Sequence, residues 1–236
     1  MSKDYFTFKQ FVIQQDRCAM KVCTDACILG AYAAVNEAKA VLDIGTGTGL
    51  LALMAAQRSQ AKFDAVEVNP EAYQQAVQNV AASPFAKRIQ LFDQSIQAFS
   101  LEQNRLYDVI ISNPPFFQNH LLSPQPDRNT ALHTESLSFE ELLQSVDRLL
   151  SSEGEFQVLL PIYEAGILTQ KAKAFGLFPL RQLSIRHSAQ HSVFRIILTF
   201  SRSPALIKEE ELTIFQVDNQ YSRAFQLLLQ EYYLIF

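Results

Sequence analysis

The sequence predicts an α/β protein built on a doubly wound, mostly parallel sheet. From residue 40 onward, short apolar runs alternate with helix-like segments, which is the pattern of strand–helix–strand units. A glycine-rich loop at residues 45–49 joins the first of these runs to the first of the helices. Two later strand-like runs, residues 180–186 and 193–200, are only six residues apart. Because no crossover helix fits between them, we expect them to pair antiparallel and to close the sheet.

The first forty residues predict a small element ahead of this sheet. Residues 6–13 alternate in part between apolar and polar side chains, as in a short hairpin strand. Thr24 and Asp25 offer an N-cap for a helix that runs through Ala34. No internal repeat or flexible linker divides the chain, whose length is near the upper size for one hydrophobic core. We therefore expect one domain over residues 1–236, with an N-terminal element at about residues 1–35.

Five strands and their helices follow in the middle of the chain. The expected strands cover residues 41–44, 63–68, 89–92, 107–112 and 155–160, and the expected helices cover residues 50–58, 71–82, 138–150 and 163–175. Pro70 suits the first turn of the second of these helices. Ser138, followed by Glu140 and Glu141, is a capping pattern for the third. With the closing hairpin the sheet has seven strands, and residues 221–232 predict a last amphipathic helix.

The composition and the cysteine spacing bear on the location of the protein and on whether it binds a metal. No run of about 18 apolar residues exists, so no transmembrane span is expected. The N-terminus lacks the basic start and apolar stretch of a secretory signal, and we expect a cytoplasmic protein. Cys18, Cys23 and Cys27 have neither a Cys-x-x-Cys pair nor a matching histidine pair, so we expect reduced thiols and no metal site.

Charge is unevenly distributed along the chain. The net charge of −4 argues against a non-specific nucleic-acid binder. Residues 165–207, however, contain no Asp or Glu. The bases of this acid-free segment are Lys171, Lys173, Arg181, Arg186, Arg195 and Arg202. Two buried strands would explain the missing acids but not six retained bases, so we interpret the segment as a basic face.

The loop after the first strand predicts a ligand site. Its sequence, Asp43-Ile44-Gly45-Thr46-Gly47-Thr48-Gly49, has Gly-x-Gly-x-Gly spacing and not the dinucleotide spacing Gly-x-Gly-x-x-Gly. Closely spaced glycines permit a tight turn and a close approach by a ligand at the helix N-terminus. Asp43 suits a cationic amine better than a pyrophosphate. The alternative is a tight turn that binds nothing.

Two further acidic residues end neighbouring strands. Glu67 lies 22 positions after Gly45, where a carboxylate can accept hydrogen bonds from both ribose hydroxyls. Asp93 ends the third strand, where it either accepts a hydrogen bond from an adenine amino group or caps a loop. A pocket with this many acids fits a sulfonium cation carrying an ammonium group better than the phosphates of NAD.

The tetrapeptide Asn113-Pro114-Pro115-Phe116 follows the apolar run at residues 107–112. Its prolines fix φ and remove two donors, which leaves backbone carbonyls outside the sheet ladder. Asn113 and Pro114 can therefore offer oxygens to the two N–H groups of a flat amine, and Phe116 can stack on its ring. The alternative is a turn that ends the strand, with a Phe that only packs.

Together these features resemble the S-adenosylmethionine-dependent amino-methyltransferases over roughly residues 20–200. The resemblance implies a Rossmann-like methyltransferase fold, with S-adenosylmethionine as cofactor and an acceptor loop that holds the amine. The catalytic residues it implies are Asn113, Pro114, Pro115 and Phe116. The cofactor-binding residues it implies are Asp43, Gly45, Thr46, Gly47, Gly49, Glu67, Val68, Asp93, Gln94 and Thr24.

A closer resemblance lies near the N-terminus. Phe8-Lys9-Gln10-Phe11 and Met20-Lys21-Val22-Cys23-Thr24-Asp25 are similar to the bacterial tRNA(Val) adenine-N6 methyltransferases, which modify adenine 37. The chain departs from that pattern at Cys23 and Ala26, where glycines are expected, and at Leu132, where a base is expected. The resemblance implies a tRNA substrate and an N-terminal element that closes over the methionine end of the cofactor.

Other interpretations stay open at this point. The same acceptor loop would serve an rRNA guanine-N2 methyltransferase or a protein-glutamine methyltransferase. A non-catalytic module that binds the cofactor or RNA is a further alternative. For the tRNA interpretation, Arg186, Arg195 and Arg202 are the candidate phosphate contacts in the acid-free segment. The oligomeric state does not follow from the sequence, and a monomer is the default expectation.

Overall fold

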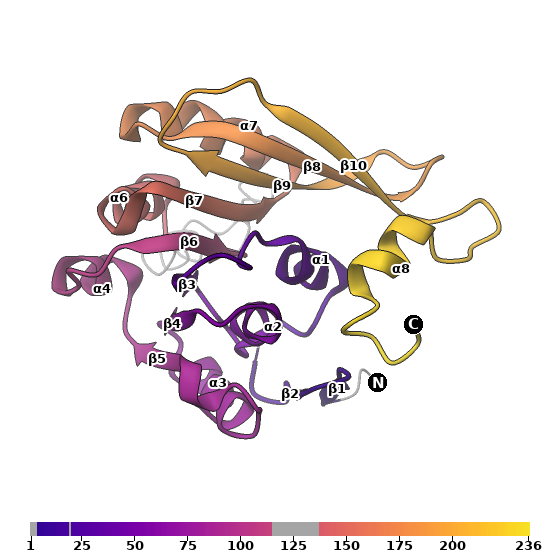
Figure 1. Cartoon of the computed structure of the whole chain (residues 1–236), viewed down its shortest axis with the longest axis horizontal. Helices are drawn as coiled ribbons and strands as arrows, with labels where there is room; N and C mark the ends of the chain where they lie inside the picture. The colour runs from indigo at the N-terminus through magenta and orange to yellow at the C-terminus, as the bar shows by residue number, and fades with distance from the viewer. Residues whose placement is uncertain (1–3, 19, 115–136) are drawn as a thin grey trace, which may run out of the picture.

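The computed structural model describes residues 4–18, 20–114 and 137–236, and a Rossmann-like sheet lies at its centre (Figure 1). Within these ranges eight strands form the sheet in the order β10-β8-β9-β7-β6-β3-β4-β5. The strands are β3 (Ala40–Ile44), β4 (Lys62–Glu67), β5 (Ile89–Asp93), β6 (Tyr107–Ser112), β7 (Leu150–Leu160), β8 (Phe178–Ser188), β9 (Val193–Ser201) and β10 (Lys208–Phe215). Strands β3 to β7 pair parallel, and β9 pairs antiparallel with both β7 and β8. The expected parallel sheet and closing hairpin are confirmed.

The expected count of seven strands is wrong, because β10 adds an eighth at the edge of the sheet. Its first four residues, Lys208–Glu211, are all charged and do not resemble a buried strand. As an edge strand, β10 pairs with β8 alone and holds these charges at the surface. Charged residues on an edge also discourage pairing with other chains. Such charged residues are typical of an edge strand. Because β10 contains no apolar run at its start, the sequence does not predict it as a strand.

Helices cover both faces of the sheet (Figure 1). They are α1 (Thr24–Tyr32), α2 (Leu50–Arg58), α3 (Pro70–Ala81), α4 (Ile96–Glu102), α6 (Phe139–Leu149), α7 (Ile162–Ala172) and α8 (Arg223–Leu229), with short 3₁₀ turns η1 (Ala86–Arg88) and η2 (Lys173–Phe175). One hydrophobic cluster packs α1, α2 and α8 against one face, and a second packs α4, α6 and α7 against the other. All five residues of β3 are buried, as expected for a central parallel strand.

Local capping explains where several helices begin. Ser138 and Glu141 form a capping box at α6, with the Ser138 hydroxyl accepting from the Glu141 N–H at 3.2 Å. Pro70 is the first residue of α3, as predicted, and the Asn69 side chain caps that helix. Helix α1 begins at Thr24, but Cys23 occupies the N-cap position without a side-chain hydrogen bond. The predicted cap by Thr24 and Asp25 is therefore wrong.

The N-terminal hairpin and the C-terminal tail lie side by side (Figure 1). Strands β1 (Tyr5–Thr7) and β2 (Val12–Gln14) pair antiparallel, as the alternation at residues 6–13 predicts. The Lys9 N–H donates to the carbonyl of Tyr232 at 2.8 Å. Asn79 of α3 holds the other side of the hairpin, because its side chain both accepts from and donates to the Gln14 backbone. The hairpin thus fixes the start of the segment that leads to α1.

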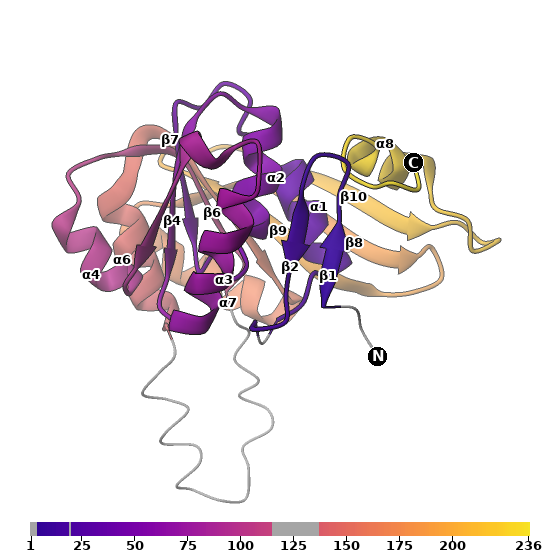
Figure 2. The same ribbon diagram turned by 90° about the horizontal axis from the view of Figure 1, so that it is seen from below.

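That segment, of which residues 15–18 and 20–23 are described, passes the carboxyl end of β6, where Met20 contacts Asn113, at the lower end of the coloured ribbon in Figure 2. It links a hairpin anchored on α3 to a helix packed on α2. In the described part of the chain, every helix is too short or too polar to span a membrane.

Candidate functional site

The candidate site lies at the carboxyl ends of β3, β4, β5 and β6. These strands are neighbours in the sheet and run parallel, so their ends meet at one edge. Glu67 and Asp93 are register partners at the ends of β4 and β5. Asn113 follows the last residue of β6, and the Ser112 hydroxyl ties β6 to β3 by donating to the carbonyl of Ile44 at 2.9 Å. Glu67, Asp93 and Asn113, each predicted at the end of a strand, therefore lie at one edge of the sheet.

The glycine loop adopts a conformation that only glycine takes easily. Gly45 and Gly47 have φ values of 70° and 58°, in the left-handed region. The backbone N–H groups of Gly45 and Thr46 donate to the carbonyl of Val66, which fixes the loop against β4. A Cβ built on Gly45 would meet no atom within 4 Å. The loop thus leaves open space above its backbone for a ligand to approach.

Asp43 is fully buried beneath this loop. One carboxylate oxygen, Oδ2, accepts from the Thr46 hydroxyl at 2.6 Å and from the Ala52 N–H at 3.1 Å. The other, Oδ1, is buried and has no hydrogen-bond partner among the described residues. Burial raises the pKa of Asp43 to about 7, and the two hydrogen bonds oppose this shift. A buried carboxylate with one unpartnered oxygen fits a ligand that brings an N–H donor and a positive charge.

Glu67 is held by two loops. Its Oε2 atom accepts from the Gly47 N–H and its Oε1 atom from the Asn69 N–H, both at 2.8 Å. Each carboxylate oxygen has two lone pairs, so each can accept one more hydrogen bond. The side chain is therefore already oriented for the paired hydroxyls of a ribose.

Three of the remaining predicted cofactor residues lie at or just after the ends of β4 and β5, and the fourth lies on α1. Asp93 is exposed at the end of β5, and the Gln94 N–H donates to the carbonyl of Glu67 at 3.2 Å. Val68 presents an exposed apolar side chain directly after β4. Thr24 is exposed at the first turn of α1. The donor and acceptor set as a whole fits S-adenosylmethionine, since carboxylates can pair with a cation and accept from hydroxyls, and the glycines leave room for a ligand.

Asn113 has the chemistry expected of an amine acceptor. Its Oδ1 atom is buried and has no partner among the described residues. Its Nδ2 atom points to the Met20 sulfur at 3.9 Å. Pro114 is buried next to it, whereas Pro115 and Phe116 lie outside the described residues. The amide oxygen is thus left to accept a hydrogen bond from a ligand.

The structure gives the predicted RNA-binding arginines intramolecular partners. Arg186 pairs with Glu211 at 2.8 Å, Arg195 with Asp25 at 3.0 Å, and Arg202 with Asp147 at 2.7 Å. Two more bases of the acid-free segment also form ion pairs, Lys171 with Glu140 and Arg181 with Glu155. Acids from neighbouring elements thus face the bases of this segment. Its role as an RNA-binding face stays a prediction.

Two residues that lie near the site received no individual role from the sequence. Met20 contacts Asn113, and the sulfur of Cys18 lies 3.9 Å from where a Cβ on Gly47 would stand. Both come from the segment between β2 and α1. Its path over the glycine loop depends on the hairpin docking on α3, which no local pattern reveals.

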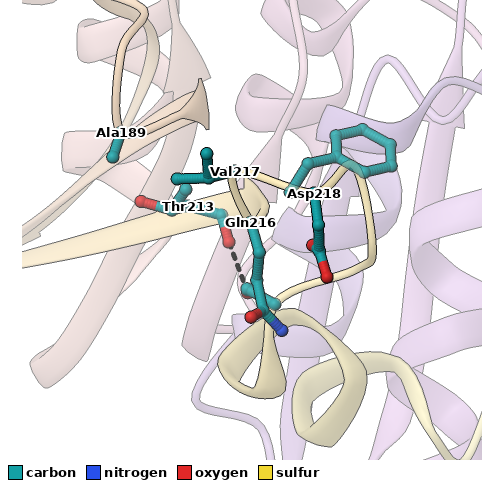
Figure 3. Close-up of a pocket in the computed structure, with 7 residues that line it drawn as sticks. Ala189, Thr213, Gln216, Val217 and Asp218 are labelled. Atoms are coloured by element: carbon teal, nitrogen blue, oxygen red, sulfur yellow. Dashed lines mark hydrogen bonds between the residues drawn. The ribbon is translucent and has the colours of Figure 1, made fainter.

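A separate hollow lies at the far edge of the sheet (Figure 3). It is lined by Ala189, Thr213, Phe215, Gln216, Val217, Asp218 and Ser222. The Ser222 hydroxyl donates to the carbonyl of Thr213 at 2.5 Å. These residues belong to the end of β10 and its surroundings, with β8, β9, β7 and β6 between them and β3. The hollow contains none of the predicted site residues.

Comparison with known proteins agrees with this geometry. The family model of the methyltransferase small domain matches residues 27–161. A tRNA1(Val) (adenine(37)-N6)-methyltransferase from Dyadobacter fermentans is 48% identical and covers 98% of each chain. A protein of the same name from Histophilus somni is 43% identical and covers 99% of each. A solved structure, a predicted O-methyltransferase from Agrobacterium tumefaciens, is similar with a TM-score of 0.67 at 17% identity, covering 88% of this chain and 96% of that one. At that identity the structural likeness shows the fold alone.

Proposed function

The chain belongs to the tRNA1(Val) (adenine(37)-N6)-methyltransferase family, and we propose that it methylates N6 of adenine 37 in tRNA(Val) with S-adenosylmethionine as methyl donor. One observation carries the proposal: the amide oxygen of Asn113, which has no partner among the described residues, lies at the same strand edge as the glycine loop and Glu67. This arrangement supports an amine acceptor beside a cofactor site. S-adenosylmethionine carries a methyl group on a positively charged sulfur. An amine lone pair can attack the carbon of that methyl group directly, and the sulfur leaves as a neutral thioether.

The cofactor is held by residues with distinct tasks. Asp43 faces its ammonium group with the Oδ1 atom, which has no partner among the described residues, and Glu67 accepts from the ribose hydroxyls. Asp93 accepts from the adenine amino group, while Val68 packs on the ring. We also propose that the N-terminal element, about residues 1–35, encloses the methionine end, because Cys18 lies beside Gly47.

The acceptor loop prepares the amine of the target adenine. The lone pair of an exocyclic amine is delocalised into its ring, which makes the nitrogen a poor nucleophile. Hydrogen bonds from its two N–H groups to the Asn113 Oδ1 atom and the Pro114 carbonyl favour a tetrahedral nitrogen with a localised lone pair. The enzyme then acts by positioning and electrostatics, without a covalent intermediate. A base is unnecessary if the product loses its proton after the transfer.

The edge of the site offers surfaces on which RNA bases can stack. An adenine in an anticodon loop must leave its stack to enter a pocket, and aromatic or apolar side chains replace the lost contacts. Tyr163 is exposed at this edge, at the start of α7. We propose that Tyr163, with Phe116, contacts the target loop. The proposed enzyme acts in the cytoplasm, as a monomer and without a metal ion.

The decisive experiment supplies the purified protein with methyl-labelled S-adenosylmethionine and unmodified tRNA(Val). We expect label in N6-methyladenosine at position 37, located by nuclease digestion and mass spectrometry, and no label in a transcript with guanine at that position. Ribosomal RNA and total protein from the same cells serve as competing substrates. Label that appears only in guanine or in protein glutamine would overturn the proposal.

A further inference from the structure

The side-chain amide of Asn113 contacts a methionine from another part of the fold. Its Nδ2 atom lies 3.9 Å from the sulfur of Met20, 93 residues earlier in the chain. Its Oδ1 atom is buried without a partner among the described residues. A thioether sulfur has lone pairs and no hydrogen, so it can accept from the NH₂ end of an amide but cannot donate to the oxygen end. Met20 therefore favours one of the two amide orientations.

The two orientations differ in what they offer an amine. With Nδ2 on the sulfur, Oδ1 is left to accept a hydrogen bond from the target. After a flip, the NH₂ group would face the N–H groups of the target, donor against donor. The first orientation is the one that the proposed reaction requires, and this argument rests on the proposed function.

The backbone on both sides of Met20 is anchored. The Arg17 N–H donates to the Gln75 side chain on α3, and the Val22 N–H donates to the side chain of Gln15, both at 2.8 Å. These two hydrogen bonds hold the backbone at residues 17 and 22, on either side of Met20. Met20 is itself 45% exposed, so the hydrophobic core does not depend on it.

We infer that Met20 is a positioning residue for the methyl transfer, which holds the Asn113 amide with its oxygen toward the target amine. Met20 touches no reacting atom in this role and acts only through Asn113. The inference predicts that activity follows the hydrogen-bonding character of residue 20 and not its size or its effect on RNA affinity.

Two variants of opposite character test this. In Met20→Glu a carboxylate can accept from Nδ2, and we expect a single-turnover rate within about twofold of the wild type at saturating tRNA and cofactor. In Met20→Lys an ammonium group can only donate, which attracts Oδ1 and favours the flipped amide. Because hydrogen bonds to charged groups are stronger than those between neutral groups, we expect the rate to fall at least about tenfold. Met20→Leu removes the preference and should lower the rate by about twofold, because the two orientations become equally populated.

The variants distinguish the orientation of the Asn113 amide from a general effect of charge on tRNA binding. A lysine near RNA phosphates should tighten tRNA binding and a glutamate should weaken it, opposite to the expected order of rates. Leu101→Lys and Leu101→Glu, at an exposed position on α4, control for charge alone and should leave the rate unchanged. Calorimetry with S-adenosylmethionine checks that each variant still binds the cofactor.

Each outcome has one meaning. Equal rates for Met20→Lys and Met20→Glu, or a wild-type rate for Met20→Lys, would overturn the inference while the proposed function stands. A wild-type enzyme that leaves adenine 37 unmethylated would overturn the proposed function, and the inference that rests on it.

Discussion

The carboxylate of Glu67 accepts a hydrogen bond from the backbone N–H of Gly47 at 2.8 Å, across two neighbouring strand ends. Its second oxygen accepts from the N–H of Asn69, the residue that caps α3. One side chain thus joins the loop after β3 to the loop after β4. A residue predicted to bind a ribose therefore also shapes the loop that receives the rest of the cofactor.

This double role gives a first prediction, for Glu67→Gln. Glutamine keeps the size of the side chain, but its NH₂ end must face one of the two backbone N–H groups. We expect the affinity for S-adenosylmethionine to fall by about 10- to 100-fold, because hydrogen bonds to a charged acceptor contribute about 1.5–3 kcal/mol. Calorimetry measures the loss. Glu71→Gln, an exposed change in the first turn of α3, is the matched control and should bind normally. Equal affinities for both variants would remove Glu67 from the cofactor site.

Asp43 makes cofactor binding depend on pH. Burial raises the pKa of its carboxyl group to about 7, so below that pH the residue holds a proton. A cationic ligand favours the ionised form, and its binding must displace the proton at low pH. We therefore expect affinity for S-adenosylmethionine to rise about tenfold from about pH 5.5 to about pH 7, a range in which an α-amino group stays protonated. Asp43→Asn should bind weakly and without this dependence. A wild-type affinity that is flat over the range would contradict the assignment.

Asn113→Ala should separate catalysis from cofactor binding. The alanine removes the oxygen that accepts from the target amine, and the Asp43 and Glu67 contacts stay intact. By analogy with the removal of a single oriented hydrogen-bonding group from other active sites, we expect the turnover rate to fall about 10²- to 10³-fold. Calorimetry should show unchanged affinity for S-adenosylmethionine. Asn104→Ala, at an exposed position before β6, is the control. A normal rate in Asn113→Ala would exclude the proposed acceptor role.

The parts of the fold that follow from the sequence are those decided by neighbouring residues. Ser138 and Glu141 cap α6 because they are three residues apart, whatever lies around them. Gly45 and Gly47 take left-handed conformations that the loop spacing already requires. Glu67 and Asp93 meet because parallel strands of known order end at one edge. Local chemistry and sheet topology were sufficient for these features.

Other features depend on distant partners, and the sequence does not reveal them. The contact of Met20 with Asn113 requires the N-terminal hairpin to dock on α3 first. Strand β10 is stable as an edge strand only because β8 is there to pair with it. The arginines of the acid-free segment resemble an RNA-binding face until their acidic partners, which lie far away in the sequence, are known.

Arg202 allows a structural role of such an arginine to be distinguished from a role in RNA binding. Its guanidinium donates to the Asp147 side chain at 2.7 Å and to the carbonyls of Asp147 and Leu150 at 2.5 and 3.1 Å. These contacts satisfy the C-terminal end of α6. We expect Arg202→Ala to lower the free energy of unfolding by about 1–2 kcal/mol in urea denaturation, with little change in tRNA affinity. Weaker tRNA binding without a loss of stability would instead support the RNA-binding assignment.

Tyr163 is proposed to contact RNA, so replacing it should change the affinity for tRNA. It is exposed at the start of α7, directly after β7, on the edge that holds Asn113. Stacking of a base on an aromatic side chain contributes about 1–3 kcal/mol, so Tyr163→Ala should weaken tRNA binding by about tenfold or more. Tyr163→Phe keeps the ring and should bind tRNA normally. Filter binding with unmodified tRNA(Val) measures the affinity. If Tyr163→Ala binds as tightly as Tyr163→Phe, the target loop does not stack at this edge, and its path over the enzyme must lie elsewhere.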